Sequence, residues 1–376
     1  MLDVLVVGAG PAGSVAATLL ARAGARVRIV DRSVFPRDKL CGDTVNPGTV
    51  AILKRLQVAA SIDACGLAVE GMRVSGENGV VVEGRYPSGR TGRALLRRHF
   101  DWMLLQDALD AGAQFEPAVA VRHAIVEDGR VAGVRLGAGG ELRATVTIAA
   151  DGRRSTLAFG LGLAAHPRRP RRWAIGAYVD ERTRPGPGAV LGEMHVRAGH
   201  YIGIAPVPGG LTNVCVVVPW RAGDAPIPDP RRAIVDALSR DAWLRDRFAG
   251  ARMATTPVVL GPLAVDVRQA SIDGLLVAGD AAGFIDPMTG DGLRFAIRGA
   301  ELTAAAAVEV LAHGWDGVHA RLARTRRDEF SAKWRFNRTV RSLAASPLAV
   351  SVAAAGARLV PACLRRAMVY AGDCPS

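Results

Sequence analysis

A glycine-rich turn close to the amino terminus constrains this chain more than any other feature. Leu2–Val7 is a continuous apolar run, typical of a buried parallel strand, and Gly8-Ala-Gly10-Pro-Ala-Gly13 follows it directly. Ser14–Ala23 then consists of helix-forming residues, and a second strand over Arg26–Val30 ends at Asp31. This β-α-β pattern predicts a dinucleotide site, in which bare glycine backbone approaches a pyrophosphate at a helix N-terminus and the acid accepts hydrogen bonds from a ribose.

Two later motifs distinguish FAD from other dinucleotides. One is Thr147-Ile-Ala-Ala-Asp151-Gly152-Arg-Arg-Ser155, and the other is Leu275-Leu-Val-Ala-Gly279-Asp280, continued by Pro287-Met-Thr-Gly290-Asp-Gly292. Together with the glycine turn, this ordered set resembles the FAD-dependent oxidoreductases of the p-hydroxybenzoate-hydroxylase type. Within them it resembles most the geranylgeranyl-reductase-like branch, over about residues 1–330. The resemblance implies a flavoprotein oxidoreductase.

The resemblance also assigns residues to the cofactor. It implies that the glycines of the turn surround the FAD pyrophosphate, that the adenosine ribose binds Asp31, and that the ribityl chain binds Asp280. The full implied set is Gly8, Gly10, Pro11, Ala12, Gly13, Asp31, Arg32, Cys41, Gly42, Arg97, Asp151, Gly152, Gly279, Asp280, Pro287, Gly290, Gly292 and Leu293. No second dinucleotide fold is evident, so we expect NAD(P)H to bind transiently, or an external electron-donor protein to supply electrons.

The long helix expected over Asp291–Leu311 has a chemical consequence of its own. Reduced flavin is electron-rich along its pyrimidine edge, and the first turn of a helix offers unpaired N–H groups and partial positive charge. We therefore expect the start of this helix to face that edge.

A cysteine loop supplies one catalytic candidate. The segment Lys39-Leu-Cys41-Gly42 resembles a loop that the branch places near the isoalloxazine ring, and in prenyl reductases of the family this cysteine is implicated in catalysis. Cys41 is therefore a catalytic candidate, and the alternative is an inert packed thiol.

A later segment supplies the other catalytic candidates, His200 and Tyr201, in the stretch that corresponds to the family's substrate-sheet strand. Either side chain could act as a general acid or base, and the alternative is an ordinary sheet contact. Prenyl reductases carry a Tyr-x-Trp-x-Phe-Pro pattern here, but Gly203 and Ala205 replace its Trp and Phe.

These features leave three functions open: a monooxygenase, a reductase of C=C bonds, and a protein without catalytic activity. The missing aromatic residues favour a monooxygenase that uses NAD(P)H and O₂ on a small apolar molecule of polyketide, phenolic or isoprenoid type. The Cys41 loop favours the reduction of C=C bonds by a geranylgeranyl-reductase-like enzyme. A non-catalytic escort protein for prenyl groups or lipids is less favoured, because an escort has no need of Asp280 or Gly290-x-Gly292.

The predicted fold class is mixed α/β, with a Rossmann-type FAD-binding domain. That domain comprises 1–165 and 260–330, with a strand excursion near 68–96 into a substrate sheet. An antiparallel-sheet substrate domain over 166–259 is inserted into it, and a helical region over 331–376 follows. Further expected elements are a hairpin over Gly71–Tyr86, a three-stranded meander over Val119–Ile148, and helices over Gly48–Leu56, Arg98–Ala111 and Pro230–Phe248.

Composition excludes several other classes. The net charge is +13, but nearly all the basic residues are arginine, which indicates the codon bias of a GC-rich genome, and no basic helix interleaved with aromatics predicts nucleic-acid binding. The five cysteines form no CxxC pair, so neither a zinc site nor a disulfide framework is expected.

The start of the chain lacks a signal-peptide pattern, and the longest apolar run, Leu343–Ala357, is short for a membrane span, which predicts a cytoplasmic protein. We expect the arginine-rich C-terminal helices to cover an apolar pocket with a solvated arginine face. Contact with an anionic membrane is the less favoured alternative.

Overall fold

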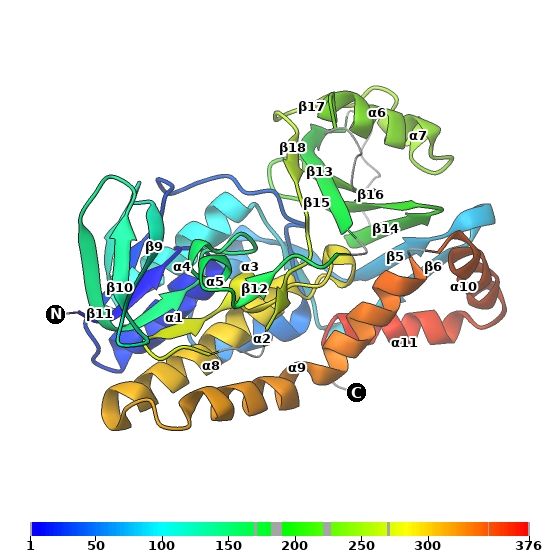
Figure 1. The fold of residues 1–376 in the computed structure, drawn as a ribbon. Helices are drawn as coiled ribbons and strands as arrows, with labels where there is room; N and C mark the ends of the chain where they lie inside the picture. Colours follow the sequence, from blue (N-terminus) through cyan, green and yellow to red (C-terminus); the bar gives the residue numbers. More distant parts are fainter. Residues whose placement is uncertain are drawn as a thin grey trace.

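The computed structural model describes residues 2–168, 171–181, 190–220, 227–268, 271–344 and 346–374, and its main parts are two large β-sheets, the helices packed on them and a group of C-terminal helices (Figure 1). The first sheet is mixed and carries helices on one face. The second is antiparallel apart from one strand pair, and it lies beside the first. The mixed α/β class predicted from the sequence is therefore confirmed.

The first sheet has the strand order β8-β2-β1-β11-β10-β9, with β20 pairing to β11. Its strands are β1 (Leu2–Val7), β2 (Val27–Val30), β8 (Gln114–Glu116), β9 (Val121–Glu127), β10 (Arg130–Leu136), β11 (Glu141–Ala149) and β20 (Leu275–Val277). β1 reads as a continuous apolar run because both of its faces are buried. Val4 and Val6 pack among the helices, whereas Leu5 and Val7 pack among residues of the β9–β11 meander.

The carboxyl ends of the parallel strands coincide at one edge of this sheet. Val7 of β1 is in register with Val30 of β2 and Ala149 of β11, and Ala149 is in register with Val277 of β20. Open α/β sheets bind ligands at such an edge. Pairing alone therefore gathers four segments that are far apart in the chain, namely Gly8–Gly13, Asp31, Asp151–Gly152 and Gly279–Asp280.

Helices cover one face of the first sheet. They are α1 (Pro11–Arg22), α2 (Pro47–Arg55), α4 (Arg97–Asp110) and α8 (Gly292–His313). Shorter elements lie between the main ones: α3 (Ile62–Cys65), α5 (Thr156–Gly160), the small sheet of β3 (Thr44–Val45), β7 (Gly92–Ala94) and β4 (Leu67–Val69), and the pair of β12 (Ala164–Ala165) and β19 (Asp266–Val267).

The second sheet has the order β17-β13-β16-β15-β14-β5-β6, with β18 pairing to β13. Its strands are β5 (Gly71–Ser75), β6 (Val81–Arg85), β13 (Arg171–Asp180), β14 (Leu191–Arg197), β15 (His200–Pro206), β16 (Leu211–Trp220), β17 (Arg252–Met253) and β18 (Val258–Leu260). Strands β5 and β6, from the range 68–96, pair at its edge, where β5 runs parallel to β14.

The single helix predicted over Pro230–Phe248 is wrong. The segment forms two helices, α6 (Pro230–Arg240) and α7 (Arg245–Phe248), which cover the outer face of the second sheet. Asp241 breaks the helix because its buried carboxylate accepts hydrogen bonds from the backbone N–H groups of Trp243 and Leu244. The same carboxylate pairs with Arg197 of β14 at 2.7 Å, a contact between residues far apart in sequence.

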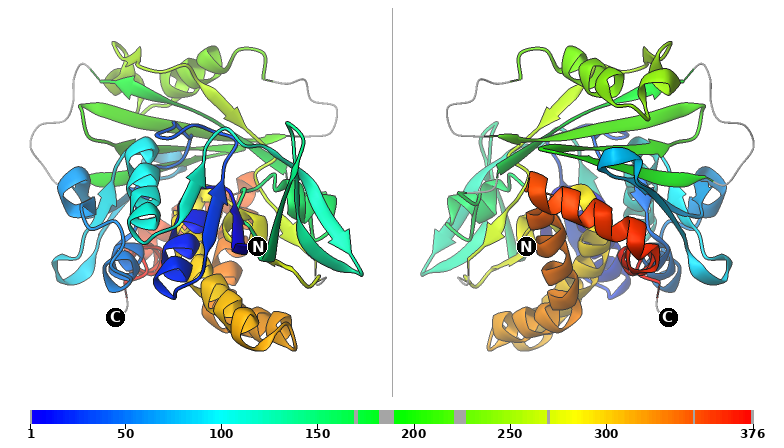
Figure 2. Two further views of the ribbon diagram at one scale, coloured as in Figure 1. Left: turned by 90° about the vertical axis from the view of Figure 1, so that its left-hand side faces the viewer. Right: turned by 90° about the vertical axis from the view of Figure 1, so that its right-hand side faces the viewer.

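Three C-terminal helices complete the fold: α9 (Val318–Leu343), α10 (Pro347–Leu359) and α11 (Pro361–Ala371). α9 packs along α8, while α10 and α11 lie by the β5–β6 edge of the second sheet (Figure 2). Most of the apolar run Leu343–Ala357 forms α10. Across the described ranges, no helix combines the length and the apolar character that crossing a membrane requires.

Candidate active site

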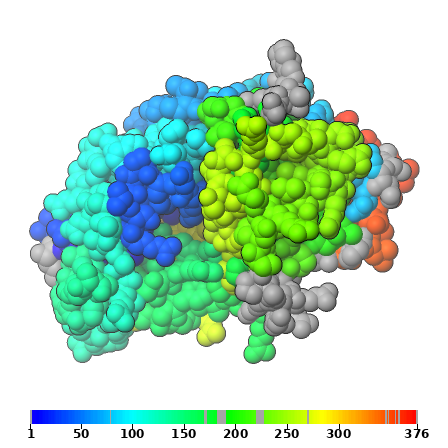
Figure 3. Space-filling view, turned by 90° about the horizontal axis from the view of Figure 1, so that it is seen from above, coloured from blue at the N-terminus to red at the C-terminus, as the bar shows by residue number. Residues whose placement is uncertain are grey.

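A large cavity of about 880 Å³ lies between the two sheets and the C-terminal helices. Its wall combines the carboxyl edge of the first sheet, the inner face of the second sheet and one side of α9, α10 and α11. Seen from above, the surface is hollowed between the blue amino-terminal region and the green to yellow region of the second sheet (Figure 3).

The three glycines of the first turn have different roles. Gly8 has φ +105°, and a Cβ there would lie 2.5 Å from the carbonyl oxygen of Ala150. A Cβ on Gly13 would lie 1.8 Å from the carbonyl oxygen of Gly8, so these two glycines are required by backbone packing. Gly10 is different, because its Cβ would meet only Arg37 Nη2 at 3.7 Å and it lines the cavity. The loop therefore presents bare backbone to the cavity at the start of α1, together with Pro11 and Ala12.

Asp31 is bound to this loop. Its Oδ2 accepts a hydrogen bond from Ala9 N at 2.8 Å, and its Oδ1 accepts one from Ser33 N at 2.8 Å. Each carboxylate oxygen has a second lone pair, which a ribose hydroxyl can use. Arg32, also predicted to bind the cofactor, is exposed, and the cavity wall formed by the described residues does not include it.

Two arginines place positive charge beside the glycine turn. Arg97 forms two hydrogen bonds with the buried Asp101, at 2.6 and 2.8 Å, and Arg37 Nη2 lies 3.0 Å from the same carboxylate. Arg37 Nη1 is buried and has no hydrogen-bond partner in the described part of the chain. Two guanidinium groups on one carboxylate leave one positive charge uncompensated, next to Gly10, which is what a diphosphate requires.

Arg37 was not among the predicted FAD-binding residues. Its only sequence signal was the cluster of basic residues around the Cys41 loop, and the contact that places it near Gly10 is tertiary. Burial lowers the pKa of Arg37, whereas the neighbouring Asp101 raises it.

The start of α8 forms another part of the cavity wall. Pro287, Gly290, Gly292 and Leu293 all line the cavity, and Gly290 adopts φ +70°. Gly292 and Leu293 are in the first turn of α8, where a helix offers no backbone acceptor for its N–H groups. These groups fit the electron-rich edge of a flavin.

The acid at this helix start is turned to other partners. Asp291 Oδ1 lies 3.3 Å from Lys333 Nζ and 3.5 Å from Asn46 Nδ2. Burial raises the pKa of Asp291, while Lys333 lowers it. The first turn of α8 therefore contributes its backbone amide groups to the cavity wall, while the Asp291 carboxylate is paired with Lys333.

Two further motifs border the same space. Gly152, with φ +85°, lines the cavity beside Asp151, whose Oδ2 accepts a hydrogen bond from Thr156 N at 2.7 Å. Burial raises the pKa of Asp151. Gly279 and Asp280 line the cavity near α1, and a Cβ on Gly279 would lie 2.8 Å from the Ala12 side chain.

The predicted catalytic cysteine lies on the cavity wall. Cys41 and Gly42 both line the cavity, and the Cys41 thiol lies beside the Arg97 guanidinium. Burial lowers the pKa of Arg97, but Asp101 and Cys41 raise it well above its usual value. The Cys41 carbonyl accepts a hydrogen bond from Asn213 Nδ2 at 2.8 Å, which anchors the loop to β16.

Asn213 also connects the cysteine loop to a buried acid. Its Nδ2 donates to Asp43 Oδ2 at 2.5 Å, and Asp43 is only 1% exposed. Burial raises the pKa of Asp43 to about 7, although hydrogen bonds from Tyr178 and Asn213 lower it in part. Asp43 was not predicted as a site residue. Its position two residues after Cys41 was the available signal.

His200 and Tyr201, the other two predicted catalytic residues, lie in positions that suit catalysis less well than that of Cys41. Within the described residues, the cavity wall includes Gly203 and Ala205 of the same strand but neither His200 nor Tyr201. The Tyr201 hydroxyl donates a 2.5 Å hydrogen bond to Asp286, which pairs with Arg172 at 3.2 Å.

His200 stands at the start of β15, where burial lowers its pKa. The catalytic roles of His200 and Tyr201 stay predictions, and their placement indicates structural contacts instead.

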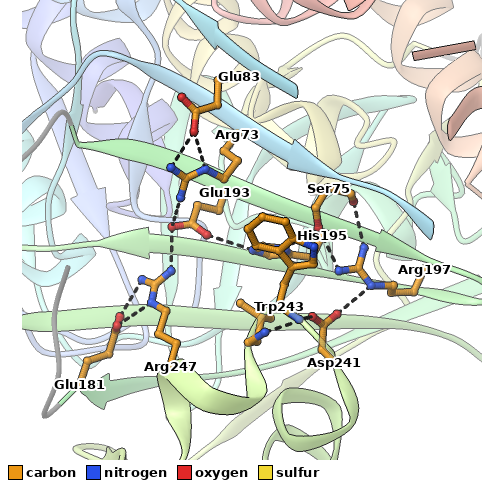
Figure 4. A network of polar contacts seen from close by, with 11 residues as sticks. Arg73, Ser75, Glu83, Glu181, Glu193, His195, Arg197, Asp241, Trp243 and Arg247 are labelled. Atoms are coloured by element: carbon orange, nitrogen blue, oxygen red, sulfur yellow. Dashed lines mark hydrogen bonds and ion pairs between the residues drawn. The ribbon is translucent and has the colours of Figure 1, made fainter. Parts of the chain in front are cut away.

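A buried polar network joins β14 to β5 and α7 (Figure 4). His195 contacts Ser75 Oγ at 2.7 Å and Glu193 Oε2 at 3.1 Å, and Arg247 of α7 donates to Glu193 and Glu181 at 2.7 to 2.9 Å. Burial raises the pKa of Glu193, but His195 and Arg247 lower it overall. The network fixes β14, whose residues Gly192, Glu193, Met194 and Val196 line the cavity.

Together, the fold and the site define an FAD-dependent oxidoreductase, because the glycine backbone at Gly10, the Arg97 guanidinium and the first turn of α8 line one cavity. The chain belongs to the FAD binding domain family, whose model matches residues 1–333. The predicted flavoprotein family is therefore confirmed, and the escort alternative is not retained because related proteins are named as reductases.

Relatives with assigned activities include two types of reductase. The chain is 32% identical over 317 residues to a menaquinone reductase of Mycolicibacterium smegmatis, covering 80% of this chain and 75% of that one. It is 30% identical over 324 residues to a digeranylgeranylglycerophospholipid reductase of Methanosarcina mazei, covering 83% and 76%.

Solved structures share the fold at lower identity. The flavin-dependent brominase Bmp2 superimposes with a TM-score of 0.84 at 20% identity, covering 99% of this chain and 94% of that one. A geranylgeranyl bacteriochlorophyll reductase-like protein of Thermoplasma acidophilum gives 0.78 at 22% identity, covering 93% and 89%. At these identities the similarity establishes the fold alone.

Proposed function

We propose that this protein reduces C=C bonds in the isoprenoid chain of a lipid or a lipid-soluble quinone, with FAD as its resident cofactor. The observation that carries the proposal is the continuity of the cavity. One space extends from Gly10 and Asp280 at the cofactor edge, past Cys41, to side chains of the C-terminal helices that are almost entirely apolar. The relatives named as menaquinone and digeranylgeranylglycerophospholipid reductases support the same substrate class.

The apolar end of the cavity suits a flexible hydrocarbon chain. It is lined by Phe336, Val340, Leu343, Val350, Leu364 and Met368, which come from all three C-terminal helices, and by Val360 between α10 and α11. On the opposite wall, Gly203 and Ala205 leave space where prenyl reductases carry aromatic residues. Apolar lining excludes water and binds substrate mainly by burial of hydrocarbon surface.

Reduction of a C=C bond needs a hydride equivalent at one carbon and a proton at the other. Reduced FAD, when bound, supplies the hydride equivalent, and we infer that NAD(P)H or another reductant restores it. The proton comes from Cys41 Sγ, because the thiol lies on the cavity wall and the adjacent Arg97 guanidinium stabilises the thiolate that remains.

Asp43 is suited to return the proton to Cys41. With a pKa of about 7 it is about half protonated at neutral pH, and Asn213 holds it next to the cysteine loop by donating to both Asp43 Oδ2 and the Cys41 carbonyl. A carboxyl group with this property matches the requirement for general acid catalysis near pH 7.

The test uses the purified holoprotein under anaerobic conditions with NADPH and either a geranylgeranyl lipid or menaquinone. We expect a product that gains two hydrogens. Cys41→Ser is expected to bind FAD normally and to lose turnover by about a hundredfold, the usual scale of a lost acid catalyst. Cys215→Ser is the matched control, since Cys215 lines the same cavity on β16 and is expected to retain turnover. Equal turnover in the two variants would remove Cys41 from the mechanism.

Monooxygenation is the second candidate, and the absence of aromatic residues at positions 203 and 205 favours it. It predicts substrate that gains one oxygen atom, and only in air. Anaerobic formation of the reduced product excludes this candidate, whereas NADPH-driven oxygen uptake coupled to a hydroxylated product excludes the reductase.

A further inference from the structure

We propose that α10 docks the protein on the surface of an anionic lipid bilayer. The inference concerns a surface of the molecule and does not depend on the reaction proposed above. It rests on an exposed apolar helix face, on the charge of the surrounding segment, and on the position of the same helix in the cavity wall.

The first observation is that α10 is apolar on two sides. Val350, Ala353 and Gly356 face the cavity. On another side, Leu348, Val352 and Leu359 are spaced four and seven residues apart, and they are 75%, 64% and 83% exposed. A helix of a globular protein normally directs its apolar residues to one covered face. An additional, strongly exposed apolar face marks a surface that contacts another apolar phase.

The second observation is the charge of this part of the chain. Residues 331–372 contain no aspartate or glutamate, but they contain Lys333 and six arginines. Lys333 is buried and paired with Asp291. Arg335 and Arg338 precede α10 and Arg366 follows it, and all three are exposed. Apolar side chains flanked by arginines are typical of helices that lie in the interface of anionic membranes.

The third observation is continuity with the cavity. The helix that exposes Leu348 and Val352 on its outer side forms the cavity wall with Val350 and Ala353 on its inner side. Seated on a bilayer, this wall is the boundary between lipid and cavity. An apolar molecule dissolved in the membrane would then reach the cavity with little exposure to water.

A second copy of the chain fits the same face less well. A 13-residue helix is about 20 Å long and about 10 Å wide. One such face offers far less than the roughly 800 Å² per partner of a standard protein interface. Two copies would also bring two acid-free, arginine-rich segments together, and like charges disfavour this contact.

The experiment measures binding of the full-length holoprotein to vesicles by co-sedimentation, without turnover. We expect at least tenfold stronger partitioning onto vesicles of phosphatidylcholine with 30% phosphatidylglycerol than onto phosphatidylcholine alone, and a clear loss of binding at 1 M salt. The double variant Leu348→Gln, Leu359→Gln keeps the charge unchanged and is expected to weaken partitioning at least tenfold. Val235→Gln is the matched control, since Val235 is a 51% exposed valine on α6.

Three results overturn the proposal. They are absence of binding to the anionic vesicles, equal binding by the double variant, and a dimer in solution that the double variant abolishes. The last result assigns the face to a second copy. FAD content and thermal stability confirm that each variant is folded, and the salt dependence of the unmodified protein tests the electrostatic part without any substitution. The vesicle experiment contains no substrate. A failure to bind vesicles therefore does not contradict the proposed reduction of C=C bonds, and an absence of turnover does not contradict membrane binding.

Discussion

The glycine turn offers a sharp test of the cofactor site, because two of its glycines predict opposite outcomes. In Gly13→Ala the new Cβ would lie 1.8 Å from the carbonyl oxygen of Gly8. Real Cβ contacts are not shorter than 3.0 Å, so the turn must move by more than about 1 Å. Overpacking of this kind costs about 1–3 kcal/mol. We expect the apoprotein to be destabilised by that amount and FAD binding to be weakened as well.

Gly10→Ala should behave differently. Its Cβ would be 3.7 Å from the nearest atom, which is ordinary contact, and its φ of −73° and ψ of −178° suit alanine. The apoprotein should therefore change in stability by less than about 1 kcal/mol. The methyl group would nevertheless enter the cavity where the pyrophosphate approaches the backbone, so we expect at least tenfold weaker FAD binding, equivalent to about 1.4 kcal/mol.

Two assays separate these effects. Thermal unfolding of the FAD-free proteins reports the packing cost, and quenching of flavin fluorescence on titration of FAD reports affinity. Unchanged FAD affinity in Gly10→Ala would refute the placement of the pyrophosphate. An apoprotein of Gly13→Ala as stable as the original would refute the packing argument.

Three further predictions concern single side chains. Arg37→Gln should raise the FAD dissociation constant about tenfold in a fluorescence titration, because it removes a positive charge beside the glycine turn whose Nη1 has no hydrogen-bond partner among the described residues; an unchanged constant would contradict this. Burial raises the pKa of Asp43 to about 7, so the original protein should lose stability relative to Asp43→Asn as pH rises from 4 to 7, by up to about 4 kcal/mol in denaturant titrations; parallel curves would refute it. Tyr201→Phe should cost about 1 kcal/mol, through loss of the hydrogen bond to Asp286, and should leave turnover unchanged. A hundredfold loss of turnover would restore Tyr201 as a catalytic residue.

Local patterns in the sequence were sufficient to predict much of the first sheet. The apolar run Leu2–Val7 and the glycine turn are short-range signals, and the structure has β1 at the predicted residues and α1 three residues earlier than its predicted start at Ser14. The Val119–Ile148 meander is likewise present as β9, β10 and β11. The resemblance to a known family, and not a local pattern, implied that the later motifs share the cofactor with the glycine turn, and the common edge of the parallel strands is the physical reason that they meet.

Tertiary contacts decided the rest. The helix over Pro230–Phe248 is interrupted because Asp241 binds Arg197, and no local pattern reports a partner 44 residues away. Tyr201 turns to Asp286 for the same reason. The raised pKa of Asp43 depends on burial, which sequence spacing does not measure.

The sequence by itself determined the cofactor edge, because glycine conformation, strand ends and helix starts are properties of a few consecutive residues. The packing of the C-terminal helices determined the second half of the cavity. The sequence shows that the α10 segment is apolar, but only the folded chain separates Val350, which faces the cavity, from Leu348 and Leu359, which face outward. That separation depends on which surfaces the helix meets, and the surfaces come from β5, β6 and β14, more than a hundred residues earlier in the chain.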